Sequence, residues 1–182
     1  MKNVVLTGMP GAGKSTVGVV LAKILGYDFI DSDLLIQNQE GHILQYLIEH
    51  HGIDGFLEIE NQVNSDIHVE NSVISTGGSV CYCDGAMKSL KKEGIVVYIK
   101  VSYENLKRRL GNLSKRGVVI HKGSTLLDLY KERTPLYEKY ADVIVSRFIE
   151  QVQTDSKVRL IRDGKKYSYA EAVKLSAENT EK

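Results

Sequence analysis

A glycine-rich segment near the start of the chain carries residues that can bind phosphate. It reads Gly8-Met9-Pro10-Gly11-Ala12-Gly13-Lys14-Ser15, is followed by Thr16, and fits the pattern G-x-x-x-x-G-K-[ST]. Glycines let successive backbone N–H groups turn towards one anion. Lys14 can reach the β- and γ-phosphates of a nucleotide, and the Ser15 hydroxyl can bind Mg²⁺. A turn that merely joins a strand to a helix would not explain Lys14 and Ser15, so the segment predicts a nucleoside triphosphate site.

The segments on either side fit this interpretation. Residues 3–7 form a short apolar run, which is typical of a buried parallel strand. Residues 14–25 have the spacing of a helix, with Val17, Val20, Leu21 and Ile24 on one face and a glycine directly after. Such a helix would point the positive end of its dipole at the phosphate.

The rest of the chain alternates strand and helix patterns. We expect strands at 27–30, 72–76, 95–99 and 143–145, and helices at 34–40, 43–51, 56–70, 85–93, 103–110 and 125–140. Pro135 falls inside the last helix, where a proline commonly kinks or divides it. The alternation predicts an α/β fold with a parallel sheet.

Length and charge narrow the class of protein. The chain has 182 residues, a length typical of one domain, and we expect a core over about 1–146. Residues 111–123 are polar, basic and glycine-bearing, which suggests a mobile lid, and residues 156–178 suggest an edge strand at 157–161 and a final helix. The net charge of +1 argues against a nucleic-acid binder that acts through bulk charge.

Several patterns are missing from the sequence. No apolar run approaches the ~18 residues of a membrane helix, and the first residues do not resemble a signal peptide. Cys81 and Cys83 are too few for a closed zinc site and too near each other to staple the fold, so we expect reduced thiols in a loop. These observations predict a cytoplasmic protein without a membrane or nucleic-acid partner.

The base-reading and switch motifs of a GTPase are also missing, because the sequence has no N-K-x-D and no D-x-x-G after a strand. Motors and large ATPases need a longer chain. A small-molecule or nucleotide kinase remains.

From about residue 2 to about residue 145 the sequence resembles the shikimate kinases. Five features occur in the family's order: the phosphate loop, Asp31-Ser32-Asp33, Phe56-Leu57-Glu58-Ile59-Glu60, Thr76-Gly77-Gly78-Ser79, and a basic lid around Arg116 with Arg133-Thr134-Pro135-Leu136-Tyr137. The family counterparts are D-x-D, F-R-x-x-E, T-G-G-G and R-x-P-L-Y. The resemblance implies a P-loop NTPase fold of three α/β/α layers, similar to nucleoside monophosphate kinases, with about five parallel strands. It also implies a monomer that uses ATP and Mg²⁺.

The resemblance assigns roles to the acidic and glycine motifs. Asp31 would hold Mg²⁺ through a water molecule, beside the direct ligand Ser15. Asp33 would bind the acceptor hydroxyl and take its proton. Both aspartates could instead cap the helix that follows. Gly77 and Gly78 would let the backbone approach the acceptor, or would only form a tight turn.

Three arginines receive roles in the same way. Arg116 would close over the transferring phosphoryl group and stabilise its charge. Arg109 would lie against the adenine, or would belong to a solvated helix face. Arg133 would bind the acceptor carboxylate in a fork geometry, or would form a surface ion pair with Glu132 or another neighbour.

The sequence departs from the family pattern on the acceptor side. Leu57 replaces the arginine of F-R-x-x-E, a residue that would help to clamp the acceptor, and we expect Leu57 to line an altered pocket. Losing one charge-assisted hydrogen bond costs about 1.5–3 kcal/mol, or roughly 10- to 150-fold in affinity. Ser79 replaces the third glycine, and Gly117 replaces a proline in the lid.

The sequence therefore leaves three functions open. The first is ATP-dependent phosphorylation of shikimate, and the second is phosphorylation of a different small hydroxylated metabolite by the same fold. The third is a regulatory module that binds ATP without catalysis. The reactive set Lys14, Ser15, Asp31, Asp33 and Arg116 is complete, which favours the two enzymes.

Overall fold

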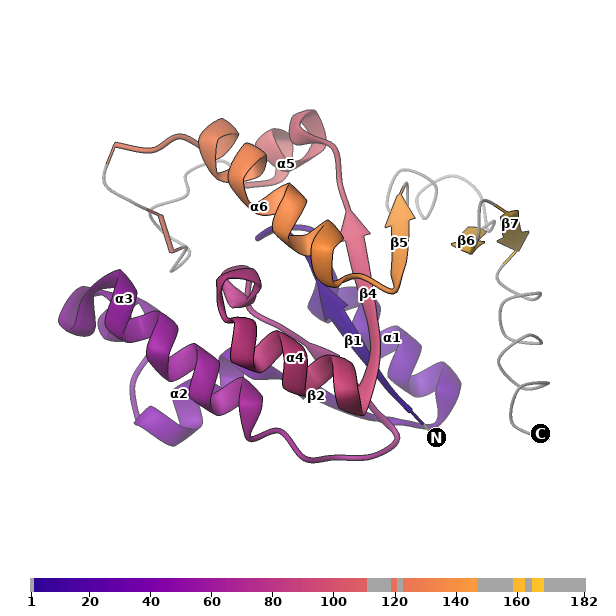
Figure 1. Ribbon diagram of the computed structural model, residues 1–182, viewed down its shortest axis with the longest axis horizontal. Coiled ribbons are helices and arrows are strands. Elements are labelled where there is room, and N and C mark those ends of the chain that lie inside the picture. The colour runs from indigo at the N-terminus through magenta and orange to yellow at the C-terminus, as the bar shows by residue number, and fades with distance from the viewer. Residues whose placement is uncertain (1, 111–118, 121–122, 147–158, 163–164, 169–182) are drawn as a thin grey trace.

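A parallel sheet of five strands forms the centre of the molecule (Figure 1). The structure is a computed structural model that describes residues 2–110, 119–120, 123–146, 159–162 and 165–168. The strands are β1 (Asn3–Thr7), β2 (Asp28–Asp31), β3 (Ser72–Ser75), β4 (Gly94–Lys100) and β5 (Val143–Ser146). They lie in the order β2-β3-β1-β4-β5, and every neighbouring pair is parallel. The predicted α/β fold is confirmed.

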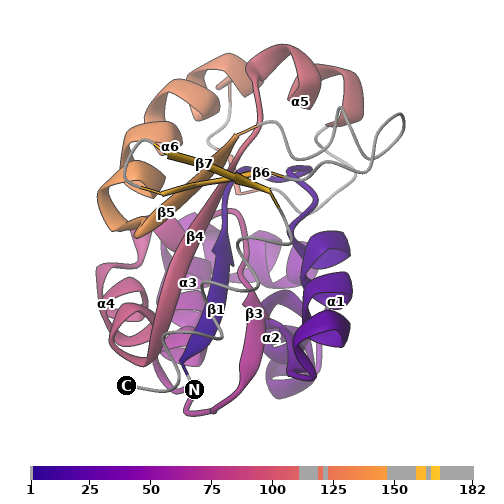
Figure 2. The ribbon, with the colours of Figure 1, turned by 90° about the vertical axis from the view of Figure 1, so that its right-hand side faces the viewer.

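Helices cover both faces of this sheet. Figure 2 shows α1 (Lys14–Leu25) and α4 (Asp84–Glu93) on opposite sides of the strands. Side chains alternate between the two faces, as expected of a strand buried on both sides. Leu6 and Val73 belong to the cluster that includes Ala22 of α1, whereas Val5 and Ile74 join the cluster of α4. The three predicted layers are therefore confirmed.

Only part of the predicted apolar face of helix α1 meets the sheet, because Val17 and Leu21 pack against the core while Val20 and Ile24 do not. Val20 and Ile24 are 55% and 49% exposed, and the buried side chains of the helix belong to Lys14 and Ala22, with Gly18 between them. A Cβ atom on Gly18 would lie 2.5 Å from the ring of Phe29. The small residues let the helix approach the sheet closely, which turns the apolar side chains of Val20 and Ile24 outwards.

Two helices after β2 pack against each other beside the sheet. They are α2 (Ser32–Glu40) and α3 (Leu44–Ser65). Gly52, with φ 72° and ψ 178°, breaks α3 between the two predicted helices 43–51 and 56–70. The second helix ends at Ser65, earlier than predicted, because Ile67 packs into the α4 cluster from the connection that follows.

Three further helical elements connect the later strands. The short 3-10 helix η1 (Val80–Tyr82) follows β3, α5 (Tyr103–Leu110) follows β4, and α6 (Leu126–Tyr140) precedes β5. Pro135 lies inside α6 without dividing it. The side chain of Thr125 caps α6 in a reciprocal capping box with Asp128.

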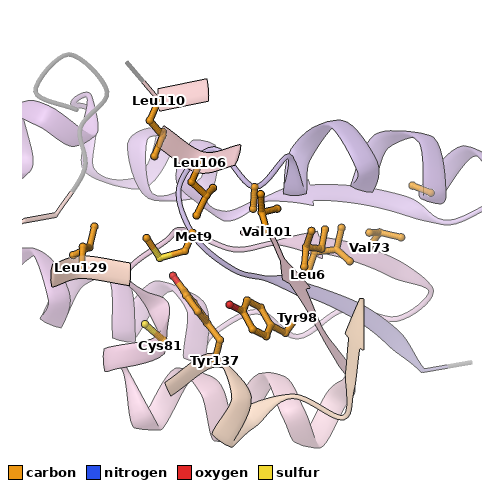
Figure 3. Close-up of a cluster of buried hydrophobic side chains, with 13 residues drawn as sticks. Leu6, Met9, Val73, Cys81, Tyr98, Val101, Leu106, Leu110, Leu129 and Tyr137 are labelled. Atoms are coloured by element: carbon orange, nitrogen blue, oxygen red, sulfur yellow. The ribbon is translucent and has the colours of Figure 1, made fainter. Parts of the chain in front are cut away.

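These helices complete a core around Tyr98 and Tyr137. Figure 3 shows the two rings side by side, with Cys81 next to Tyr137 and with Met9 on the side of Leu106. The ring centroids are 5.1 Å apart. Cys81 and Cys83 are free thiols, as predicted, and both are buried. Cys83 lies in a loop, whereas Cys81 belongs to η1, where the prediction of a loop was wrong.

The end of the chain forms a second, smaller sheet. Strands β6 (Arg159–Arg162) and β7 (Lys165–Ser168) pair antiparallel with each other. β6 begins two residues later than the predicted edge strand and does not pair with the central sheet. The predicted final helix and most of the predicted lid, including Arg116, lie outside the described residues. In the described part of the chain, no helix is long and apolar enough to span a membrane.

Candidate functional site

A cavity of about 280 Å³ opens at the carboxyl ends of the strands. This is the edge at which open α/β sheets bind ligands. Its lining combines residues of the phosphate loop, polar groups from three other elements, and four apolar side chains. They are Pro10, Gly11, Gly13, Lys14, Ser15, Thr16, Asp33, Thr76, Gly78, Ser79, Arg133, Leu44, Phe56, Leu110 and Val119.

The phosphate loop connects β1 to α1. Gly13 is the N-cap residue of α1 and has φ 93°, a left-handed conformation that side chains disfavour. Lys14 is buried, and its Nζ donates hydrogen bonds to the carbonyl oxygens of Gly8 at 2.8 Å and Met9 at 3.2 Å. Burial lowers the pKa of the Lys14 ammonium, and the charge of Asp33 opposes this shift. The loop thus places the ammonium group of Lys14 in the lining of the cavity, at the N-terminus of α1.

Ser15 and Asp31 lie side by side at the edge of the cavity. The Ser15 hydroxyl donates to Asp31 Oδ2 at 2.7 Å and is 3.2 Å from the hydroxyl of Ser75. These hard oxygen atoms suit Mg²⁺, which prefers one or two protein ligands plus the phosphates of a nucleotide. The residues present therefore fit a magnesium–nucleotide complex held by Ser15 and Asp31.

Asp31 also caps the next helix. Its Oδ1 accepts a hydrogen bond from the backbone N–H of Asp33 at 3.1 Å, so the capping role and the place beside Ser15 occur together. Asp33 is in the first turn of α2 and lines the cavity, so it does not cap the helix. Burial raises the pKa of Asp33, and the nearby Lys14 ammonium opposes this shift.

Gly77 and Gly78 are glycines because other side chains approach them closely. A Cβ atom on Gly77 would collide with the carboxyl oxygens of Glu60 and Asp33, and one on Gly78 would lie 2.7 Å from Pro10 Cγ. Gly78 lines the cavity. The backbone N–H of Gly77 donates to the Ser32 hydroxyl at 3.1 Å. This turn therefore brings the acidic residues and the phosphate loop together.

Arg133 is a buried arginine in the wall of the cavity. Its Nη1 donates to the carbonyl oxygen of Gly78 at 2.6 Å, its Nη2 donates to that of Val119, and its Nε donates to the Tyr82 hydroxyl at 3.2 Å. The guanidinium also lies 5.0 Å from the centre of the Tyr82 ring. Because only 1% of Arg133 is exposed, the surface ion pair considered from the sequence is wrong. Glu132 instead accepts a hydrogen bond from Tyr82 at 2.9 Å.

Five of the described predicted site residues are not among the lining residues: Ala12, Asp31, Gly77, Leu57 and Arg109. Leu57 is partly buried against the α4 cluster, and its carbonyl oxygen accepts from the Cys83 thiol at 3.5 Å. Its neighbour Phe56 lines the cavity instead. Arg109 is half-buried on α5 and is not among the lining residues, although Leu110 is. The adenine contact of Arg109 therefore stays a prediction.

Sequence reasoning missed one buried charge in this region, Glu60. It is completely buried in α3, and its Oε1 has no hydrogen-bond partner among the described residues. Burial raises the pKa of Glu60 to about 7, against the opposing effect of the Ser79 hydroxyl. The sequence signal that could have revealed this burial is the helical spacing: Glu60 lies on the same face of α3 as the buried Phe56 and Val63, where an apolar residue is expected.

Comparisons with known proteins agree with this geometry. A model of the shikimate kinase family matches residues 10–161. The shikimate kinase of Clostridium botulinum (strain 657 / Type Ba4) is 36% identical over 171 residues, covering 92% of this chain and 98% of that protein. The shikimate kinase of Francisella tularensis subsp. holarctica (strain FTNF002-00 / FTA) is 38% identical over 148 residues, covering 79% and 84% of the two chains.

Solved structures give the same result. The shikimate kinase from Acinetobacter baumannii, in complex with shikimate, aligns with a TM-score of 0.74 and 33% identity, covering 80% of this chain and 83% of that one. The shikimate kinase from Bacteroides thetaiotaomicron aligns with a TM-score of 0.71 and 29% identity, covering 84% and 91%. With the phosphate loop and the acidic and arginine residues in one cavity, these matches show that the chain belongs to the shikimate kinase family of ATP- and Mg²⁺-dependent small-molecule kinases.

Proposed function

We propose that this chain transfers the γ-phosphoryl group of ATP to a hydroxyl group of shikimate, giving ADP and shikimate 3-phosphate. The observation that carries this proposal is the shared cavity, which Lys14, Asp33 and Arg133 all line. A cavity with a phosphate loop, a carboxylate and a buried guanidinium suits an acceptor that has both a hydroxyl and a carboxylate. The similarity to the Acinetobacter baumannii enzyme, which was solved with shikimate, supports this choice of acceptor.

Each residue has a distinct task in this proposal. Lys14 and the loop N–H groups hold the phosphates, and Asp33 orients the acceptor hydroxyl and takes its proton as the new P–O bond forms. Arg133 binds the acceptor carboxylate, and Gly78 allows the acceptor close to the backbone. Mg²⁺, when held by Ser15 and Asp31, neutralises negative charge on the phosphate oxygens. Arg116 closes over the phosphoryl group, and Arg109 lies against the adenine.

A second candidate is a related kinase reaction on a different small hydroxylated metabolite. Leu57 favours it, because a leucine side chain supplies no hydrogen-bond donor and its side chain packs against the α4 cluster. Under this alternative the phosphate half of the site keeps its role, and only the acceptor changes.

The test is ADP release from purified protein with Mg-ATP, with and without shikimate. We expect a shikimate-dependent rate with a sub-millimolar KM in the wild type and no measurable turnover in Lys14→Ala. Lys23→Ala, an exposed lysine on the same helix, is the matched control and should keep the wild-type rate. ATP binding without shikimate-dependent turnover would reject shikimate and favour the second candidate, to be sought among neutral sugars and polyols.

We also propose that the chain works as a monomer in the cytoplasm. The resemblance to the shikimate kinases implies this monomer. Cys81 and Cys83 are free thiols, which suits a reducing compartment. Light scattering after size exclusion should give a mass near 20.3 kDa, and a mass of twice that value would reject the monomer.

A further inference from the structure

Glu60 is a completely buried carboxyl group that the proposed reaction does not use. It lies in α3, where the charges of Lys14 of α1, Asp33 of α2 and Arg133 of α6 act on it, and its nearby hydrogen-bond donors are the Ser79 hydroxyl before η1 and the Cys83 thiol after η1. On α4, which also packs against α3, Asp84 and Lys88 pair with each other at the surface, 2.6 Å apart. Glu60 thus sits among the residues of the acceptor half of the site.

The carboxyl groups of Glu60 and Asp33 approach each other over Gly77. Glu60 Oε1 and Asp33 Oδ1 both lie less than 3 Å from the position that a Cβ atom would take on Gly77. Oε1 has no hydrogen-bond partner within 3.5 Å among the described residues, and Oε2 lies 3.9 Å from the weak thiol donor of Cys83. The Ser79 hydroxyl is the other donor near this carboxyl group. Two ionised carboxylates in such a place repel each other, unless a cation or a proton lies between them.

The charges of Lys14 and Arg133 reach Glu60, but neither side chain forms an ion pair with it in the described part of the chain. Lys14 Nζ donates to two carbonyl oxygens of the phosphate loop. The Arg133 guanidinium donates to the carbonyl oxygens of Gly78 and Val119. One turn before Glu60 on the same face of α3, the side chain is the apolar Leu57, which cannot compensate a charge. A proton is the remaining way to relieve the repulsion.

We propose that Glu60 is a positioning residue that holds a proton up to about neutral pH and, when protonated, donates a hydrogen bond to the Asp33 carboxylate, holding Asp33 in the orientation that the acceptor hydroxyl needs. The proposal deepens the proposed function and rests on it for the identity of the acceptor. The proton that Glu60 binds is not transferred in the reaction, because Asp33 takes the acceptor's proton with its other oxygen.

The electrostatics of the site agree with this geometry. Burial raises the pKa of Glu60 to about 7, and the charge of Asp33 adds to the rise, while Ser79, Arg133 and Lys14 oppose it. Above neutral pH the Glu60 proton is lost, which leaves a second negative charge beside Asp33. An acceptor with a carboxylate should then bind more weakly, both because Asp33 is displaced and because like charges repel.

Two measurements test the proposal. The first is a ¹³C NMR titration of the glutamate carboxyl carbons, which reads the Glu60 proton without any acceptor. We expect one resonance that titrates near pH 7 and disappears in Glu60→Gln. Leu57→Arg places a guanidinium one turn away and should move this titration below pH 6. If Glu60→Gln fails to fold, the shift in Leu57→Arg still identifies the resonance.

The second measurement is shikimate binding by calorimetry at pH 6 and pH 8. We expect the wild type to bind about tenfold more weakly at pH 8, because only the protonated fraction is competent to bind. Glu60→Gln, which is neutral at both pH values, should lose this difference. Glu58→Gln changes an exposed glutamate on the same helix and should behave as the wild type does.

The outcomes separate this inference from the proposed function. A Glu60 carboxyl that is ionised at pH 6 in the NMR titration overturns the inference, whatever the enzyme binds. An equal pH effect in the wild type and in Glu60→Gln also overturns it. Failure of all variants to bind shikimate at either pH rejects the proposed acceptor, and the NMR titration then decides the protonation of Glu60 alone.

Discussion

Replacing Glu60 by glutamine should change how the stability of the protein depends on pH. Glutamine has nearly the same shape as glutamate but carries no ionisable group. In the folded protein burial raises the pKa of Glu60 from 4.5 to about 7, so the folded state holds this proton more tightly than the unfolded state does. The tighter binding of this proton therefore adds its full amount to the unfolding free energy below pH 4.5, and this stabilisation is lost as the pH rises through 7.

The size of the effect follows from these two pKa values. Each pKa unit corresponds to about 1.4 kcal/mol, so the whole shift amounts to about 3 kcal/mol of unfolding free energy. Most of it falls between pH 5 and pH 8. Across this range the wild type should lose about 2 to 3 kcal/mol relative to Glu60→Gln. This is a large part of the 5–15 kcal/mol that stabilises a typical domain.

Urea denaturation at pH 5, 6, 7 and 8 measures this difference. Other titrating groups contribute to both proteins, so subtracting one unfolding free energy from the other isolates residue 60. Glu58→Gln serves as the control, since Glu58 is exposed and its removal should leave the pH dependence of the wild type unchanged. A constant difference between the wild type and Glu60→Gln from pH 5 to pH 8 would refute the reasoning, because it would mean that Glu60 is ionised in the folded protein.

Three further substitutions test other parts of the structure. Gly18→Ala places a Cβ atom 2.5 Å from the Phe29 ring and should lower the unfolding free energy by about 1–3 kcal/mol in urea denaturation. Tyr82→Phe removes the oxygen that accepts from Arg133 Nε, at a cost of about 1 kcal/mol, and should raise the acceptor KM roughly fivefold with little change in kcat. Thr125→Ala removes the capping box of α6 and should lower the melting temperature, for a loss of about 1 kcal/mol.

Each of these changes has a matched control. Val19→Ala alters an exposed side chain next to Gly18, Tyr46→Phe removes an exposed hydroxyl on α3, and Ser124→Ala alters an exposed residue beside the cap. We expect changes of no more than 0.5 kcal/mol from these surface substitutions. A test variant that behaves as its control does would show that the contact in question contributes nothing measurable.

The phosphate side of the site could be predicted from the sequence because the residues that form it are consecutive in the chain. The loop from Gly8 to Ser15 specifies a turn, a helix start and two reactive side chains within eight consecutive residues. The strand pattern also held, because each strand of the central sheet contains a short apolar run. Asp31 and Asp33 were placed correctly at the end of a parallel strand, and the structure adds which of the two caps the helix.

The acceptor side depends on packing between distant segments, and there the sequence was less informative. Periodicity gave α1 an apolar face, but the contact between Gly18 and Phe29 decided which face meets the sheet. Leu57 was expected in the pocket, yet the rotation of α3 directs Phe56 there instead. The full burial of Glu60 was not apparent either, because it depends on how α2, α3 and the turn after β3 meet in space.

The hydrogen bonds of Arg133 limit how the specificity of this protein can evolve. One guanidinium holds the carbonyl oxygens of both Gly78 and Val119, so it supports two walls of the cavity as well as facing it. A lysine, with one compact ammonium group, could not reproduce this planar fork. Any exchange of Arg133 to suit a new acceptor would therefore also loosen the walls. Ser79 also lines the cavity but does not join two of its walls, so this position is one where acceptor preference can change without first losing the fold of the site.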